Sequence, residues 1–231
     1  MNDGIRNNIL RIQEKISESA LKAGRKPDDI KLMAVSKRFS VDSIVSAYNN
    51  GIRLFGENRA GEAVEKFSDL KIDFELHFIG HLQSNKCKMI SKIADCVQSI
   101  DKFKTASLLN DFCEKEGRTI DILFEMNTSG EDSKNGFKSE EIFFRTLDQV
   151  RELKNIKIRG LMTIGPMTAD EKAIRNSFAR LRNLYEKLES EHRDLSLDTL
   201  SMGMSSDYEI AIDEGSTLIR LGTAIFGDRK Y

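Results

Sequence analysis

Residues 32–58 read LMAVSKRFSVDSIVSAYNNGIRLFGEN, and this stretch shows the unit from which the chain is built. A short run of β-branched and apolar residues, Leu32 to Ser36, leads into a polar turn and an amphipathic helical stretch. A second apolar run, Arg53 to Gly56, follows. A strand, a helix and a second strand in this order predict a right-handed crossover and a parallel sheet.

The same unit recurs along the whole chain. The eight apolar runs are Leu32 to Ser36, Arg53 to Gly56, Leu76 to Ile79, Cys96 to Ile100, Ile122 to Met126, Ile158 to Thr163, Thr199 to Met202 and Leu218 to Gly222. Eight runs in 231 residues fit a closed (β/α)8 TIM barrel better than an open doubly wound sheet, because no GxGxxG turn follows the first run. The sequence therefore predicts an α/β barrel.

An extra helix is predicted ahead of the first strand. Ile5, Ile9, Ile12, Ile16 and Ala20 recur at helical spacing, with charged residues between them. We expect this amphipathic helix to cover part of the barrel with its apolar face.

Two further predictions concern the later helices and the domain boundaries. Thr168 to Glu171 has the pattern of a capping box and is expected to open a long helix. Because no Pro-, Gly- or Ser-rich linker interrupts the chain, we expect residues 1–231 to form a single domain.

Composition limits the possible partners and locations. The 36 Lys and Arg nearly balance the 37 Asp and Glu, so no overall field attracts nucleic acid or an anionic membrane. Without a secretory signal or an apolar run of membrane-span length, we expect a cytoplasmic protein. Cys87, Cys96 and Cys113 form no CxxC pair, and we expect reduced thiols and no metal site.

Lys37 follows the first predicted strand, at the end where barrels carry functional residues. Met33, Val35 and Lys37 alternate with period two, and since Val35 is apolar we assign this face to the barrel interior. An inward lysine loses hydration, which lowers its pKa and leaves a neutral amine able to attack a carbonyl group. A lysine that extends along the surface into water would also explain this residue.

Loops with small residues follow the last two predicted strands. One contains Ser205 within SMGMSS, residues 201–206, and the other begins with Gly222 and Thr223. Such loops expose backbone N–H groups that can bind a phosphate together with Ser and Thr hydroxyls. Barrels commonly hold phosphate at these two loops, although each loop alone also fits a plain βα turn.

Arg220 and Asn58 complete the set of candidate site residues. Alternation along the last strand points Arg220 inward with Leu218 and Gly222, and a cation inside a barrel needs an acceptor. That acceptor is either a ligand or a carboxylate such as Glu57 or Glu125. Asn58 follows the second strand and either donates to a ligand or caps the next helix.

These residues together indicate a phosphorylated carbonyl compound bound as a Schiff base. Pyridoxal 5′-phosphate (PLP) meets this description, and so does the substrate of a lysine-dependent aldolase.

His77 and His81 have no third metal ligand nearby and are expected to be structural. Lys86, Lys88 and Lys92 are expected to lie on a solvated helix face rather than in a nucleic-acid site.

Six segments in this order resemble the pyridoxal phosphate homeostasis protein family. They are Ala34 to Lys37, Phe55 to Asn58, His77 to Lys86, Gly160 to Thr163, Leu200 to Ser205 and Arg220 to Gly227. The HxIGxxQxNK and SMGMS strings are highly specific in combination, and the segments span nearly the whole chain.

The resemblance implies a fold-type III PLP-binding barrel like the N-terminal domain of alanine racemase, with Lys37 as the Schiff-base lysine. It places the phosphate near Ser205, Gly222 and Thr223. It also implies that Arg220 faces the pyridine nitrogen and that Asn58 lies close to the cofactor.

The resemblance further implies a protein that binds PLP and takes part in PLP homeostasis without established turnover. Racemases of this fold need a second base, a Tyr from an additional β domain, whereas this sequence ends at Tyr231. An Arg at the pyridine nitrogen also weakens the ring as an electron sink. We therefore expect no catalytic residues and no enzyme, with an amino-acid racemase or a lysine Schiff-base aldolase as alternatives. The expected partners are PLP and PLP-dependent apoenzymes, and the expected state is a monomer.

Overall fold

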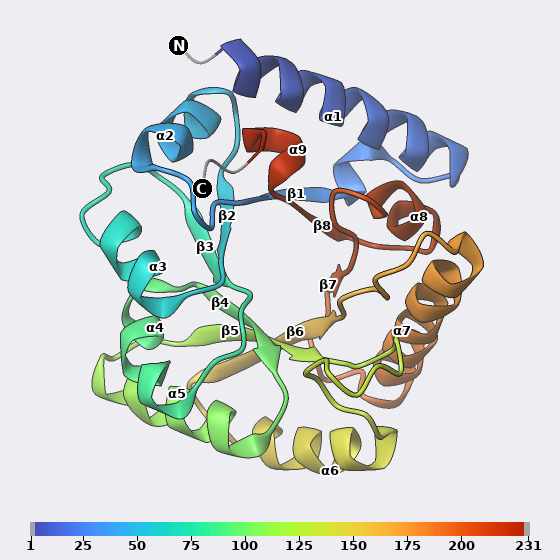
Figure 1. Cartoon of the computed structure of the whole chain (residues 1–231). Coiled ribbons are helices and arrows are strands. Elements are labelled where there is room, and N and C mark those ends of the chain that lie inside the picture. The colour runs from blue at the N-terminus through green and yellow to red at the C-terminus, as the bar shows by residue number, and fades with distance from the viewer. Residues whose placement is uncertain (1–2, 229–231) are drawn as a thin grey trace.

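The computed structural model describes residues 3–228 and shows a closed barrel of eight parallel strands in the order β1 to β8 (Figure 1). The strands are β1 (Lys31–Val35), β2 (Leu54–Glu57), β3 (Glu75–Phe78), β4 (Cys96–Ile100), β5 (Ile120–Glu125), β6 (Ile156–Met162), β7 (Thr199–Ser201) and β8 (Leu218–Leu221). Each predicted run overlaps its strand, and the ends differ by at most two residues. The predicted barrel is thus confirmed.

Helices form an outer ring around the strands (Figure 1). They are α1 (Asp3–Lys22), α2 (Val41–Asn49), α3 (Ala60–Phe67), α4 (Cys87–Ile93), α5 (Phe103–Lys115), α6 (Glu140–Arg151), α7 (Glu171–Glu191), α8 (Tyr208–Asp213) and α9 (Thr223–Phe226), with 3-10 turns at Pro27–Asp29 and Ser84–Lys86. The strand-to-helix turns therefore gather at one mouth of the barrel, which is the usual place for a functional site.

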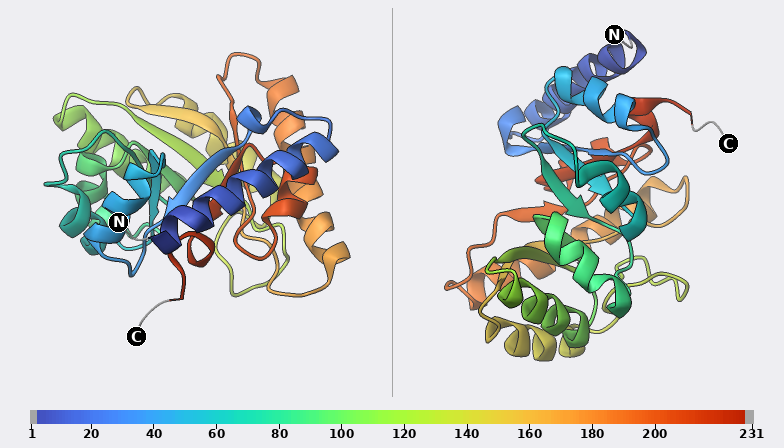
Figure 2. Two further views of the ribbon diagram at one scale, coloured as in Figure 1. Left: turned by 90° about the horizontal axis from the view of Figure 1, so that it is seen from above. Right: turned by 90° about the vertical axis from the view of Figure 1, so that its left-hand side faces the viewer.

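The helix α1 lies on the outside of the barrel, where it packs against α8 and α9 (Figure 2). Its predicted apolar face is confirmed, since Ile5, Ile9, Ile12, Ile16 and Ala20 are all buried. This face covers the side where β1 and β8 close the barrel.

The apolar core has two layers. The larger layer lies between the strands and the surrounding helices. Smaller clusters fill the barrel itself, and one of them consists of Met33, Val35, Leu54 and Leu218. Because Met33 and Val35 belong to this inner cluster, the face assigned to the barrel interior on β1 is correct.

The predicted cap of α7 was wrong. Its N-cap is Asp170, whose carboxylate accepts hydrogen bonds from the backbone N–H groups of Lys172 and Ala173. The hydroxyl of Thr168 instead accepts from the backbone N–H of Asp170. A carboxylate is favoured at a helix N-terminus by its charge as well as its hydrogen bonds, so the helix begins at Glu171.

Cys87, Cys96 and Cys113 are buried free thiols, and burial raises the pKa of each of them. Between residues 3 and 228, no group of three or more His, Cys, Asp or Glu could hold a metal ion. No helix in that range has both the length and the apolar character to cross a bilayer. Tyr231 lies outside the described residues.

Candidate functional site

A cavity of about 370 Å³ opens at the mouth formed by the carboxyl ends of the strands. Its lining consists of Val35, Lys37, Asn58, Ile79, Met162, Ile164, Met204, Ser205, Ser206, Arg220, Gly222 and Thr223. All six candidate residues named from the sequence belong to this lining. The apolar part comes from side chains that the sequence reasoning did not single out, such as Ile79, Met162 and Met204.

Lys37 reaches the cavity from the turn that follows β1. The strand ends at Val35, so Lys37 lies two residues beyond it and is half-buried. The backbone of the next residue, Arg38, adopts a left-handed conformation with φ 65°, which non-glycine residues seldom occupy. The turn therefore needs support from the surrounding side chains.

A largely buried ion-pair cluster supplies this support. Lys66 on α3 donates from Nζ to the carbonyl oxygen of Ser36 at 2.8 Å and to Glu57 Oε1 at 3.0 Å, and it also binds Glu62. Glu62 in turn accepts from the backbone N–H of Arg38. The cluster thus holds the two residues that flank Lys37. We call Glu57, Glu62 and Lys66 the β1-turn clamp.

The pKa values of the clamp carboxyl groups follow from their surroundings. Burial raises the pKa of Glu57, although Lys66 and the Ser36 hydroxyl oppose this effect. Burial alone would also raise the pKa of Glu62, but the hydrogen bonds from Lys66 and from the Arg38 backbone outweigh it and lower the pKa. The sequence reasoning missed this role of Lys66, although the spacing of four residues from Glu62 was a usable signal.

Arg220 is a buried cation whose direct partners are neutral. Its side chain is 4% exposed, and it donates to Ser201 Oγ and to the carbonyl oxygen of Thr163, both at 2.7 Å. Among residues 3–228, no carboxylate forms an ion pair with it. Burial lowers the pKa of Arg220 to about 10, against the more distant charges of Asp207 and Glu125.

This arrangement excludes one of the two alternatives left open for Arg220. The predicted ion pair with Glu57 or Glu125 does not form, because Glu57 is occupied by Lys66 and Ser36. A guanidinium has five N–H donors, and the hydrogen bonds to Ser201 and Thr163 leave other donors available to a ligand in the cavity.

Asn58 does not cap the next helix. The N-cap position of α3 is Arg59, and no side chain caps this helix. The Asn58 Oδ1 atom is buried without a hydrogen-bond partner, which is costly unless a ligand supplies one. Gly80 makes this position possible, since a Cβ atom there would lie 2.1 Å from the Asn58 carbonyl oxygen.

The part of the cavity lining that follows β7 and β8 carries hydroxyl groups and exposed backbone. Ser205 and Thr223 lie side by side, with 3.4 Å between their hydroxyl oxygens. Gly203 turns the chain with φ +95°, and a Cβ atom there would lie 2.6 Å from that of Ala211. The absence of a side chain at Gly222 leaves the start of α9 open to the cavity.

Glu125 is a further buried ionisable group at the same mouth. It ends β5 and is 5% exposed. Burial raises its pKa to about 7, helped by the negative charge of Asp101 and opposed by Arg220. The interior beside the cavity therefore disfavours a further negative charge at this point.

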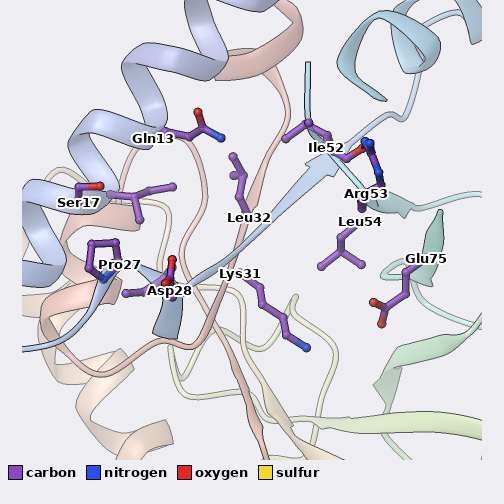
Figure 3. A pocket seen from close by; sticks show the side chains of 13 residues that line it. Gln13, Ser17, Pro27, Asp28, Lys31, Leu32, Ile52, Arg53, Leu54 and Glu75 are labelled. Atoms are coloured by element: carbon purple, nitrogen blue, oxygen red, sulfur yellow. Dashed lines mark hydrogen bonds between the residues drawn. The ribbon is translucent and has the colours of Figure 1, made fainter. Parts of the chain in front are cut away.

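A different hollow, of about 560 Å³, lies at the other mouth of the barrel (Figure 3). Lys31, Arg53 and Glu75 border it at the start of three strands. These side chains are exposed to solvent and carry charges of both signs. Because it lacks a buried cation and lies at the amino ends of the strands, we do not regard it as the main site.

Comparison with known proteins identifies the family. The alanine racemase, N-terminal domain family matches residues 3–230. The pyridoxal phosphate homeostasis protein of Aquifex aeolicus is 40% identical over 227 residues, covering 96% of this chain and 97% of that protein. The chain belongs to the pyridoxal phosphate homeostasis protein family. The member from Escherichia coli K12 is 39% identical over 243 residues, covering 100% of this chain and 99% of that protein.

Solved structures of similar proteins agree with this family assignment. PipY of Synechococcus elongatus is 34% identical with a TM-score of 0.83 without PLP, covering 94% of this chain and all of that one. Its structure with PLP bound has a TM-score of 0.81 and covers 92% of this chain. Alanine racemase of Clostridium difficile has a TM-score of 0.75 at 14% identity, covering 97% of this chain and 59% of that one, and shows that the fold is shared.

Proposed function

We propose that the cavity binds PLP and that the chain acts in cellular PLP homeostasis. The observation that carries this proposal is the joint presence of Lys37, Arg220 and a hydroxyl-bearing wall in one cavity. PipY, which is similar over nearly the whole chain, has been solved with PLP bound. The related proteins of Aquifex aeolicus and Escherichia coli carry the name pyridoxal phosphate homeostasis protein.

The described residues fit this cofactor. Arg220 is buried without a carboxylate within ion-pair distance among the residues described, and Asn58 Oδ1 is buried without a partner. Both groups therefore gain from a polar ligand in the cavity. The apolar side chains of Ile79 and Met162 offer a surface for the faces of an aromatic ring.

Each polar residue has a proposed role. When bound, PLP supplies an aldehyde that can form a Schiff base with an amine. Lys37 provides this amine, and Arg220 donates a hydrogen bond at the pyridine nitrogen. Ser205, Thr223 and the backbone at Gly222 bind the phosphate, and Asn58 contacts the cofactor at the second strand end.

We also propose that the chain holds PLP without turnover. Among the described residues that line the cavity, the ionisable ones are Lys37 and Arg220. With a pKa of about 10, Arg220 keeps its proton near neutral pH and cannot serve as a base. Racemisation needs a second base on the other face of the ring, and this lining does not provide one. Residues 1–231 would then act as a single racemase-like barrel domain that exchanges PLP with apoenzymes.

The test is a titration of the purified chain with PLP, followed by visible absorbance and borohydride reduction. Mass spectrometry should locate the reduced adduct on Lys37. Lys31→Ala, which removes the lysine at the amino end of β1, is the control and should retain the adduct. Trapping at another lysine would contradict the proposal.

A second measurement separates the enzyme alternatives. Racemisation of alanine or serine above the level of a Lys37→Ala sample would establish an amino-acid racemase. Trapping of a sugar phosphate instead of PLP would establish an aldolase. Absence of both activities in a PLP-loaded sample is the result we expect.

A further inference from the structure

A continuous chain of hydrogen bonds runs from Arg220 through the interior of the barrel. Arg220 Nη1 donates to Ser201 Oγ at 2.7 Å, and Ser201 Oγ donates to Gln98 Oε1 at 2.7 Å. Gln98 Nε2 lies 2.7 Å from His77 Nδ1, and His77 Nε2 lies 2.6 Å from Glu75 Oε1. Four strands contribute one or two residues each. We call this chain the barrel relay.

The barrel relay connects the two mouths of the barrel. Arg220, Ser201, Gln98 and His77 are all buried. Glu75, at the far end, is half-exposed and borders the hollow at the opposite mouth (Figure 3). Buried polar groups are costly unless they are paired, so the arrangement is stable only while every member keeps its partner.

The exposed end of the barrel relay, Glu75, determines which atom donates in each hydrogen bond. An ionised carboxylate only accepts, so His77 carries its proton on Nε2 and donates it to Glu75. This hydrogen bond is the main reason why the pKa of Glu75 is lowered, which keeps the carboxylate ionised. The amide nitrogen of Gln98 can only donate, so Nδ1 of His77 accepts from it.

The donor and acceptor roles of the remaining relay residues follow in the same way, up to the cavity. With its amide nitrogen on His77, Gln98 presents its oxygen to Ser201, which donates its single proton there. The remaining lone pairs of Ser201 accept from Arg220. The Thr163 carbonyl oxygen holds the other terminal nitrogen. Two terminal nitrogens are thereby fixed, and the orientation of the guanidinium is determined.

We propose that His77, Gln98 and Ser201 are positioning residues that orient Arg220 toward the ligand, and that ligand binding at Arg220 is transmitted along the relay to His77. This inference rests on the proposed binding of PLP, because Arg220 is the residue that contacts its ring. A purely structural network would stabilise the barrel but would not respond to a ligand at the other mouth.

The test uses the three histidines of the chain as probes. With nitrogen-15 in the histidine rings, NMR reports the tautomer of each ring, and His81→Gln and His192→Gln variants assign the signals. We expect Nε2 of the His77 ring to carry a proton and Nδ1 to act as an acceptor. Addition of PLP should shift the His77 signals, whereas inorganic phosphate, which lacks a ring, should leave them unchanged.

Two variants interrupt the relay at different points. Ser201→Ala removes the hydroxyl between Arg220 and Gln98, and Gln98→Met removes the amide. Each should abolish the PLP-dependent shift at His77 and weaken PLP binding by roughly 2- to 10-fold, because one positioning hydrogen bond is lost. Affinity for inorganic phosphate should not change. Ser91→Ala, at a buried serine on α4 outside the relay, should keep the His77 response.

The outcomes separate the two proposals. No spectral change when wild type receives PLP would refute the proposed function. PLP binding without a His77 response, a response that persists in Ser201→Ala, or a doubly protonated His77 ring would refute the relay alone. If Ser201→Ala does not fold, the Gln98→Met variant decides the same question.

Discussion

The buried carboxyl group of Glu125 makes the stability of the barrel depend on pH. Its pKa rises from 4.5 to about 7 on folding, chiefly through burial. A rise of this size means that folding favours the protonated carboxyl group over the carboxylate by about 3 kcal/mol. Because the folded pKa is the higher one, the folded state favours the proton, and this stabilisation is lost as the pH rises from about 4.5 to about 7.

Glu125→Gln isolates this effect, since Gln resembles the protonated carboxyl group. Compared with wild type, the variant should be more stable by up to about 3 kcal/mol at pH 8, with no gain at about pH 4. Urea unfolding of the full chain without added PLP, at several pH values, measures the difference. Glu114→Gln, at an exposed carboxylate on α5, serves as the control and should show no such trend.

Two results would refute this reasoning. A constant difference between Glu125→Gln and wild type across the pH range would show that ionisation of Glu125 is not coupled to folding. A loss of stability at pH 8 would show that the carboxylate is favourably paired in the folded state, contrary to its raised pKa.

Three further predictions concern the site. Lys37→Ala should lose the adduct that borohydride traps but keep phosphate-dependent affinity for PLP, since each charge-assisted hydrogen bond to the phosphate contributes about 1.5–3 kcal/mol. An unchanged visible spectrum would contradict the role of Lys37. Arg220→Glu should alter the absorbance of bound PLP, because a carboxylate favours a protonated ring nitrogen; the same spectrum in a folded, PLP-loaded variant would show that Arg220 does not face the ring. Lys66→Met should destabilise the chain by about 3 kcal/mol in urea unfolding, because Glu57 is left buried without its cation. The double variant Lys66→Met with Glu57→Gln should recover part of this loss of stability.

Much of the architecture could be read from local sequence patterns. Alternation with period two along Met33, Val35 and Lys37 was enough to place one strand face in the barrel interior. Helical spacing from Ile5 to Ala20 was enough to identify the apolar face of α1. These patterns are local because strand and helix geometry fix the direction of each side chain relative to its neighbours.

The sequence by itself also determined which residues reach the cavity. Each candidate follows a strand or occupies its last inward position, and the carboxyl ends of parallel strands meet at one mouth. This holds for Lys37, Asn58, Arg220 and the loop residues Ser205 and Thr223, so their common location followed from topology alone.

Only the tertiary structure decided how the polar groups pair. Glu57 and Glu125 were equally plausible partners for Arg220, yet Lys66 occupies Glu57, and the guanidinium binds Ser201 instead. Ser201 and Gln98 are 103 residues apart and meet because closure of the barrel brings β4 and β7 to face each other across its interior. Such partners depend on the register in which the strands close, and no short sequence pattern specifies that register.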